Sequence, residues 1–246
     1  MREIQFPEKD KALRDDVRAL GTLVGEMLAE QQGPEFLQLV EIVRQAAIQR
    51  RESGTGASAE LDALLSGMGV VEAGRLVRAF TTYFQVVNLA EKVHRIRRRR
   101  DYLRRGIKAQ PGGLLAVMGE LDMFSLDEVM QELRRLTIEP VMTAHPTEAT
   151  RRTLLEKEQL ILRRLVDRLD PTRTPDEEFA ALSRIRAAVT SNWQTEMYPE
   201  QKLSVRNEME HVLFYLTDVL YRIVPPFYEN LLKALESCFP EAENLL

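Results

Sequence analysis

The sequence contains few of the residues that build disulfide-linked or membrane-spanning proteins. Its 246 residues include one cysteine, Cys238, and three histidines. A single cysteine cannot form a disulfide within the chain, which excludes a disulfide-stapled fold. No run approaches the ~18 consecutive apolar residues of a membrane span, and the charged first ten residues do not resemble a signal sequence. We therefore expect a protein of the reducing cytoplasm that has no membrane partner.

Neither sign of charge dominates the composition. Lysine and arginine total 34, aspartate and glutamate total 38, and the net charge is -4. Because the chain is acidic overall, no global field recruits it to nucleic acid or to an anionic membrane. Hydrophobic residues make up 44% of the chain, which is enough to bury a substantial core in one large domain or two small ones.

Apolar residues recur at three- and four-residue spacing along most of the sequence, which predicts a mainly helical fold. The pattern breaks at Gly33-Pro34 and at Pro111-Gly112-Gly113, where we expect turns. Ser125 with Glu128, and Thr174 with Glu177, have the spacing of capping boxes and predict two helix starts. We expect the last long helix to be interrupted at Pro225-Pro226 and to resume over residues 227–235.

One short segment differs from the helical pattern. Residues 138–143 are β-prone and lead through His145-Pro146 into a helical pattern, so the imidazole is expected at a strand-to-helix corner. Pro146 restricts His145 to extended conformations and can begin the helix. Arg151 and Arg152 then fall in the first turn, where the helix dipole disfavours positive charge and a counter-anion is needed. A single strand lacks partners for its backbone, so it is either a connector or pairs with strands outside this chain.

Three segments carry a resemblance to a known family. Residues 141–148, Val-Met-Thr-Ala-His-Pro-Thr-Glu, followed by two arginines and a leucine-rich helix, resemble the first active-site signature of phosphoenolpyruvate carboxylase. Residues 80–100, with the core Tyr-Phe-Gln-Val-Val-Asn-Leu-Ala-Glu and an arginine-rich end, are similar to the family's upstream segment. Trp193-Gln194-Thr195-Glu196 resembles the downstream segment. The three segments occur in the family's order and extend the resemblance over the whole chain.

The resemblance implies a cytoplasmic, magnesium-dependent homotetramer that joins bicarbonate to phosphoenolpyruvate, giving oxaloacetate and phosphate. His145 matches the family's histidine that is implicated in the second stage, when carbon dioxide released from carboxyphosphate carboxylates the enolate. Arg151 and Arg152 are candidate ligands for the anionic phosphate or carboxyphosphate. A backbone-bonded helix-entry histidine, and arginines held by an acidic helix, are the structural alternatives. His94 and His211 lie within helical patterns and are expected to be structural.

The chain is much shorter than the family's full-length members. The glycine-rich phosphate-binding loops and the acidic magnesium ligands of the family are not visible, so we expect the Mg ligands outside this chain and no metal site within it. The resemblance divides the chain into a helical region at 1–136 and, at 137–246, the first strand of a TIM-type barrel, the active-site corner and further helices. We expect the remainder of the enzyme polypeptide to be a partner and this chain alone to be inactive.

A second interpretation rests on the segment Arg95 to Arg105, which contains seven arginines. Clustered arginine can bind phosphates, so the chain could be a helical module that binds anions or nucleic acid. On a helix, however, these side chains surround the axis, and in an acidic chain this favours a solvated or interface helix without nucleic acid. A third interpretation is a natural short protein that keeps the family's N-terminal region as a regulatory partner.

Overall fold

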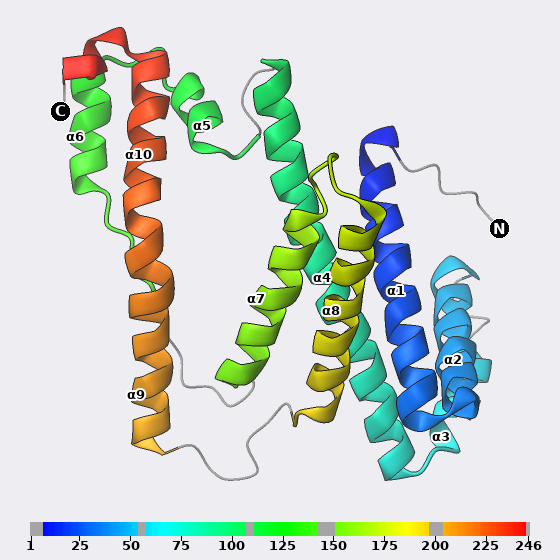
Figure 1. The fold of residues 1–246 in the computed structure, drawn as a ribbon. Helices are drawn as coiled ribbons and strands as arrows, with labels where there is room; N and C mark the ends of the chain where they lie inside the picture. Colours follow the sequence, from blue (N-terminus) through cyan, green and yellow to red (C-terminus); the bar gives the residue numbers. More distant parts are fainter. Residues whose placement is uncertain (1–6, 54–57, 107–110, 142–150, 197–203, 245–246) are drawn as a thin grey trace. The chain divides into compact units, whose positions relative to one another are not determined.

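Helices make up nearly all of the part of the chain that the computed structural model describes, which comprises residues 7–53, 58–106, 111–141, 151–196 and 204–244 (Figure 1). The elements in chain order are η1 (Glu8–Asp10), α1 (Lys11–Gln32), α2 (Pro34–Ser53), α3 (Ser58–Ser66), α4 (Val70–Arg105), α5 (Leu114–Glu120), α6 (Leu126–Arg135), α7 (Arg152–Asp167), α8 (Pro175–Gln194), α9 (Val205–Phe214), η3 (Tyr215–Leu220), α10 (Tyr221–Cys238) and η4 (Pro240–Asn244). The predicted mainly helical fold is confirmed. Across these described ranges, no helix combines the length and the apolar character that a membrane span would need.

The chain divides into two units, and each is built from two separate segments. Unit 1 comprises Met1–Ile96 and Thr153–Glu196, and unit 2 comprises Arg97–Arg152 and Met197–Leu246. Each unit therefore takes residues from both sides of the predicted boundary between residues 136 and 137. That boundary rests on the resemblance to a longer enzyme, and it stays a prediction.

The core of unit 1 lies where α1, the first part of α4, α7 and α8 run side by side (Figure 1). Each of the four helices contributes an apolar stripe with the period of an α-helix, and the stripes bury one another. The buried side chains of this core are Leu20, Val24, Met27, Leu28, Ala79, Val86, Leu89, Ala90, Val93, Ile161, Leu165, Ile185, Ala188, Val189 and Trp193. A smaller cluster joins α2 and α3 to the start of α4.

Unit 2 has a smaller core near the end of the described chain. There α5 and α6 lie against the second half of α10 and against η4. Its buried side chains are Met118, Val129, Ala234, Leu235, Phe239 and Ala242. In contrast, α9 and η3 contain no buried residue.

Several helix boundaries follow the predicted local signals. The side chain of Ser125 accepts from the backbone N–H of Glu128, and Thr174 accepts from that of Glu177, so both capping boxes are confirmed. Gly33 adopts a φ of 93° between α1 and α2, a conformation that a side chain would strain. Ser125 and Thr174 thus satisfy backbone N–H groups that a helix start leaves unpaired. Gly33 lets the backbone change direction between α1 and α2.

The predicted interruption at Pro225-Pro226 is wrong, because α10 continues through both prolines. A proline cannot donate to the carbonyl four residues earlier, and its ring crowds that carbonyl. The affected carbonyls belong to Tyr221 and Arg222, and the π-helical segment η3 directly precedes them. The helix is thus π-wound before the prolines and α-wound through them, and it does not end at them.

The predicted strand at residues 138–143 is not formed in its described part. Residues 136–141 have no regular secondary structure, and 142–143 lie outside the described residues. No strand occurs elsewhere in the described ranges, so this segment has no neighbour with which to form a ladder. Both expectations for this segment, an extended connector or a strand that pairs outside this chain, stay open, and the barrel itself stays a prediction.

Candidate active-site flanks

The predicted catalytic residue, His145, belongs to residues 142–150 and lies outside the described residues. The structure describes the chain on both sides of it. On the upstream side α6 ends at Arg135, and the chain continues to Val141 with its apolar side chains uncovered. Ile138 is 71% exposed and Val141 is 84% exposed. Fully burying such a side chain stabilises a fold by about 1.5–3 kcal/mol. Because Ile138 and Val141 are exposed, they do not contribute this stabilisation in the present chain.

The two predicted substrate-binding arginines stand on the downstream side. Arg152 is the first residue of α7, and Arg151 immediately precedes that helix, so one of the two lies inside the first turn. The guanidinium carbon of Arg152 lies 5.5 Å from the ring centroid of Phe214 within unit 2. The electron-rich face of the ring stabilises this cation. The first turn of α7 contains no acidic residue, and the role of both arginines toward an anion stays a prediction.

Trp193 and Gln194 end α8, and Thr195 is its C-cap residue. Two cations from other helices bind this end. From α4, Arg78 donates through Nη2 to the carbonyl oxygen of Trp193 and to that of Thr195, the latter at 2.8 Å. Its guanidinium carbon also lies 5.1 Å from the centroid of the Trp193 ring. From α7, Lys157 Nζ donates to the carbonyl of Ser191 at 3.1 Å and to Thr195 Oγ1 at 2.7 Å.

Further hydrogen bonds complete the end of α8. Thr195 Oγ1 donates to the Ser191 carbonyl at 2.7 Å, and the Thr195 N–H donates to the Asn192 carbonyl. Gln194 Nε2 donates to Gln31 Oε1 on α1 at 2.9 Å. The last carbonyls of a helix lack intrahelical donors and carry partial negative charge, so both the hydrogen bonds and the positive charges are favourable here.

Sequence reasoning found the Trp193–Glu196 segment but missed Arg78 and Lys157. These residues lie 115 and 34 positions before the carbonyls of Trp193 and Ser191 that they bind. No local spacing connects them, and each occurs within an ordinary amphipathic helix. Their grouping results from the tertiary packing of α4, α7 and α8, which a single sequence does not display.

The arginine-rich segment forms the last turns of α4, and several of its charges are bound within the chain. Asp101 pairs with Arg98 at 3.8 Å and with Arg105 at 2.8 Å. Arg99 donates to Asn230 Oδ1 on α10 at 3.1 Å. The guanidinium carbon of Arg98 also lies 5.0 Å from the ring centroid of Tyr102. These contacts engage arginines on more than one side of the helix, which weakens the case for a continuous phosphate-binding stripe.

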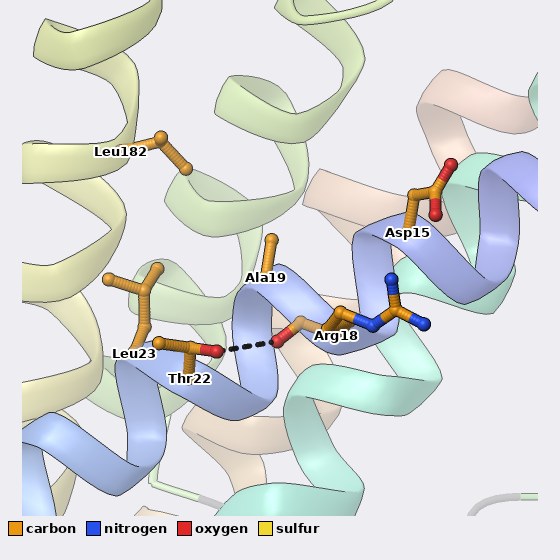
Figure 2. Close-up of a pocket in the computed structure, with 6 residues that line it drawn as sticks. All are labelled: Asp15, Arg18, Ala19, Thr22, Leu23 and Leu182. Carbon is orange, nitrogen blue, oxygen red and sulfur yellow. Dashed lines mark hydrogen bonds between the residues drawn. The ribbon is translucent and has the colours of Figure 1, made fainter.

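The other candidate sites offer little chemistry. His94 is buried with Nε2 3.5 Å from Asp10 Oδ1, and the His211 ring lies 5.0 Å from the Tyr215 ring. Within the described ranges, no group of three His, Cys, Asp or Glu side chains could hold a metal ion. A surface pocket between α1 and α8 is lined by Asp15, Arg18, Ala19, Thr22, Leu23 and Leu182 (Figure 2). The Thr22 hydroxyl there already donates to the Arg18 carbonyl at 3.1 Å, so few polar groups converge on this pocket.

Comparison with known proteins shows the family to which the chain belongs. The family model of phosphoenolpyruvate carboxylase matches residues 13–245, a range that includes His145, both arginines and the Trp193–Glu196 segment. The chain belongs to the phosphoenolpyruvate carboxylase family. It is 52% identical over 237 residues to the phosphoenolpyruvate carboxylase of Xanthomonas campestris pv. campestris. The matched region covers 95% of this chain and 26% of the relative.

More distant relatives show the same coverage. Identity is 37% over 235 residues to the phosphoenolpyruvate carboxylase of Ralstonia nicotianae, covering 94% of this chain and 24% of the relative. It is 36% over 242 residues to that of an Azoarcus species, covering 97% and 26%. The chain thus spans about a quarter of the length of the curated relatives it matches, and the resemblance inferred from three short segments is confirmed.

Proposed function

We propose that the chain supplies one wall of the active site of a phosphoenolpyruvate carboxylase, an enzyme that forms oxaloacetate and phosphate from phosphoenolpyruvate and bicarbonate. The observation that carries this proposal is the family match over residues 13–245, which contains the Thr143-Ala144-His145-Pro146-Thr147 motif. The remainder of the active site then belongs to polypeptide beyond the quarter that this chain spans. The homotetramer expected from the family likewise concerns that longer protein.

In the proposed reaction, a bicarbonate oxygen attacks the phosphorus of phosphoenolpyruvate, and the bond from phosphorus to the enol oxygen breaks. The products are carboxyphosphate and the enolate of pyruvate. His145 then accepts the proton from the carboxyl group of carboxyphosphate, which releases carbon dioxide and phosphate, and the imidazolium returns this proton to the phosphate. The enolate carbon attacks carbon dioxide and forms oxaloacetate. An imidazole suits this proton transfer because its ordinary pKa lies close to neutral pH.

Arg151 and Arg152 are proposed to bind the phosphate or carboxyphosphate anion. Guanidinium groups match the geometry of phosphate oxygens and stabilise negative charge that develops on them. The position at the start of α7 suits this role, since backbone N–H groups at a helix N-terminus also favour an anion.

Magnesium would stabilise the same anions, but the described residues do not fit a magnesium site, because they provide no group of three candidate ligands. We therefore expect the ligands in the rest of the enzyme, and no step above depends on residues of this chain binding the metal.

The isolated chain provides the first test. We expect the purified 246-residue protein to release no phosphate from phosphoenolpyruvate in the presence of bicarbonate and magnesium, because the remaining walls of the site are missing. A coupled phosphate assay measures this, with the Xanthomonas campestris enzyme as positive control. Bicarbonate-dependent turnover by the isolated chain would contradict the proposed division of the active site.

A chimera tests His145 directly. In the Xanthomonas campestris enzyme, this chain replaces the quarter that it matches, and oxaloacetate is measured through its reduction by malate dehydrogenase. We expect the chimera to carboxylate phosphoenolpyruvate and His145→Asn to lower oxaloacetate formation by about 100-fold or more, because asparagine cannot accept the proton. His211→Asn is the matched control and should remain active. A folded chimera without bicarbonate-dependent phosphate release, or a fully active His145→Asn variant, contradicts the proposal.

A further inference from the structure

Two cations from other helices bind the C-terminal end of α8. Arg78 reaches it from α4 and Lys157 reaches it from α7, and the two cations share Thr195 as a partner. Arg78 combines two carbonyl contacts with a contact to the Trp193 ring. Both cations are half-buried, so their contacts are less screened by solvent than those of a surface ion pair.

The position of Lys157 connects this cluster to the predicted catalytic motif. Lys157 lies five residues after Arg152, the first residue of α7, which corresponds to about 7.5 Å along the helix axis. In the sequence, His145 precedes Arg152 by seven residues. A side chain that binds α7 to the backbone of α8 therefore restricts the orientation of the helix from which the catalytic segment extends.

We infer that Arg78 and Lys157 are positioning residues of the active site. Together they close the C-terminal end of α8, hold the first turns of α7 against it, and set the direction in which the chain leaves α8 at Thr195–Glu196. The effect on catalysis rests on the proposed function of His145, whereas the closing of α8 is a property of this chain alone. The two parts can therefore be tested separately.

The first experiment uses the isolated chain, in which Trp193 is the only tryptophan. We expect Arg78→Ala to increase acrylamide quenching of Trp193 fluorescence and to accelerate hydrogen exchange at the Thr195 amide by about tenfold. Lys157→Met should accelerate the same amide, because it removes the donor to Ser191 and Thr195. Arg75→Ala on α4 and Arg163→Met on α7 remove exposed cations and should leave both signals unchanged.

Arg78→Lys is the conservative variant that separates loss of the guanidinium contacts from loss of folding. It keeps the positive charge but cannot present the guanidinium fork to two carbonyls, so we expect values between those of wild type and Arg78→Ala. Unchanged helical circular dichroism in each variant shows that the fold persists. Unaltered quenching and exchange in a folded Arg78→Ala variant would overturn the assignment of Arg78.

The second experiment uses the chimera and measures phosphate and oxaloacetate in parallel. A displaced catalytic segment impairs the second stage, so carboxyphosphate is hydrolysed to bicarbonate and phosphate, and the enolate takes a proton to give pyruvate. We expect Arg78→Ala and Lys157→Met to lower kcat for oxaloacetate by about tenfold and to raise the ratio of phosphate to oxaloacetate. Arg75→Ala should keep the wild-type ratio.

The ratio separates positioning from mere destabilisation, because unfolding removes both products in proportion. A wild-type ratio in variants whose α8 end is demonstrably loosened would overturn the positioning role in catalysis. Absence of any bicarbonate-dependent phosphate release in the unsubstituted chimera would instead contradict the proposed function, while the fluorescence and exchange results would still decide how α8 is closed.

Discussion

In unit 1 the apolar stripes of the long helices are buried against one another, whereas in unit 2 most of the apolar side chains between residues 205 and 228 remain exposed. Leu20 and Ile185 have an exposed fraction of 0%. Val205 is 82% exposed and Tyr221 is 79% exposed, although both belong to well-formed helices. Helix formation therefore does not distinguish the two regions, and the burial of side chains does.

The difference shows where the stability of this chain arises. Isolated helices are marginal in water, and tertiary packing of their apolar faces supplies most of their stability. The four-helix core of unit 1 supplies that packing internally, while α9 and η3 have no buried residue with which to do so. Trp193 lies in the core of unit 1, so its fluorescence reports the region where the packing is strong.

The largest expected effect comes from removing core volume in one region and exposed volume in the other. Ile185→Ala should lower the free energy of unfolding by about 2–5 kcal/mol, because it removes buried contacts and leaves a cavity. Leu216→Ala, at a side chain that is 44% exposed, should lower it by less than about 1 kcal/mol. Urea unfolding followed by Trp193 fluorescence and by far-UV circular dichroism measures both. Comparable losses for the two variants would refute the comparison.

A smaller effect is expected at the two capping boxes, one in each unit. Thr174→Ala and Ser125→Ala each remove a side-chain acceptor for a backbone N–H and should each cost about 1 kcal/mol locally. Thr174 begins the helix that carries Trp193, so its substitution should lower the fluorescence midpoint in urea. Ser125→Ala should change circular dichroism without shifting the fluorescence midpoint. An equal fluorescence shift in both variants would show that the two units unfold as one.

The sequence predicts the capping boxes and the turn correctly because the interactions that determine them are local. The caps at Ser125 and Thr174 depend on residues three positions apart, and the turn at Gly33-Pro34 depends on two neighbours. At Pro225-Pro226 the local signal predicts a break, and this prediction is wrong because the energetic penalty of the two prolines does not end the helix. In the structure α10 tolerates both prolines and follows directly on a π-helical segment, and the flanking residues do not reveal this.

The candidate site was predicted only in part, for a related reason. The motif at residues 143–147 and the adjacent arginines are contiguous, so they could be recognised as a pattern. Arg78 and Lys157 reach the end of α8 from two other helices, and their roles depend on how α4, α7 and α8 pack. No periodicity in a single sequence encodes those long-range contacts.

The smallest expected effect concerns a carboxyl group in unit 1 whose ionised form is disfavoured by burial. Glu158 on α7 is half-buried, and this burial raises its pKa above 4.5, while the positive charge of Lys92 lowers it in part. Between the ordinary and the raised pKa the folded state binds more protons than the unfolded state. Stability from this group is therefore fully present below pH 4.5 and is lost as the pH rises through the raised pKa.

Glu158→Gln removes this dependence, since a glutamine can occupy the site without a buried charge. We expect the variant to be more stable than wild type at pH 7 by less than about 1 kcal/mol, because partial exposure screens the effect. The difference should shrink toward zero as the pH falls below 4.5. Glu91→Gln, at an exposed position on α4, is the matched control. A Glu158→Gln variant that is less stable at pH 7 would show that the carboxylate of Glu158 stabilises the packing of α7 in unit 1. A gain that persists unchanged in acid would show that the gain does not come from removing a buried charge.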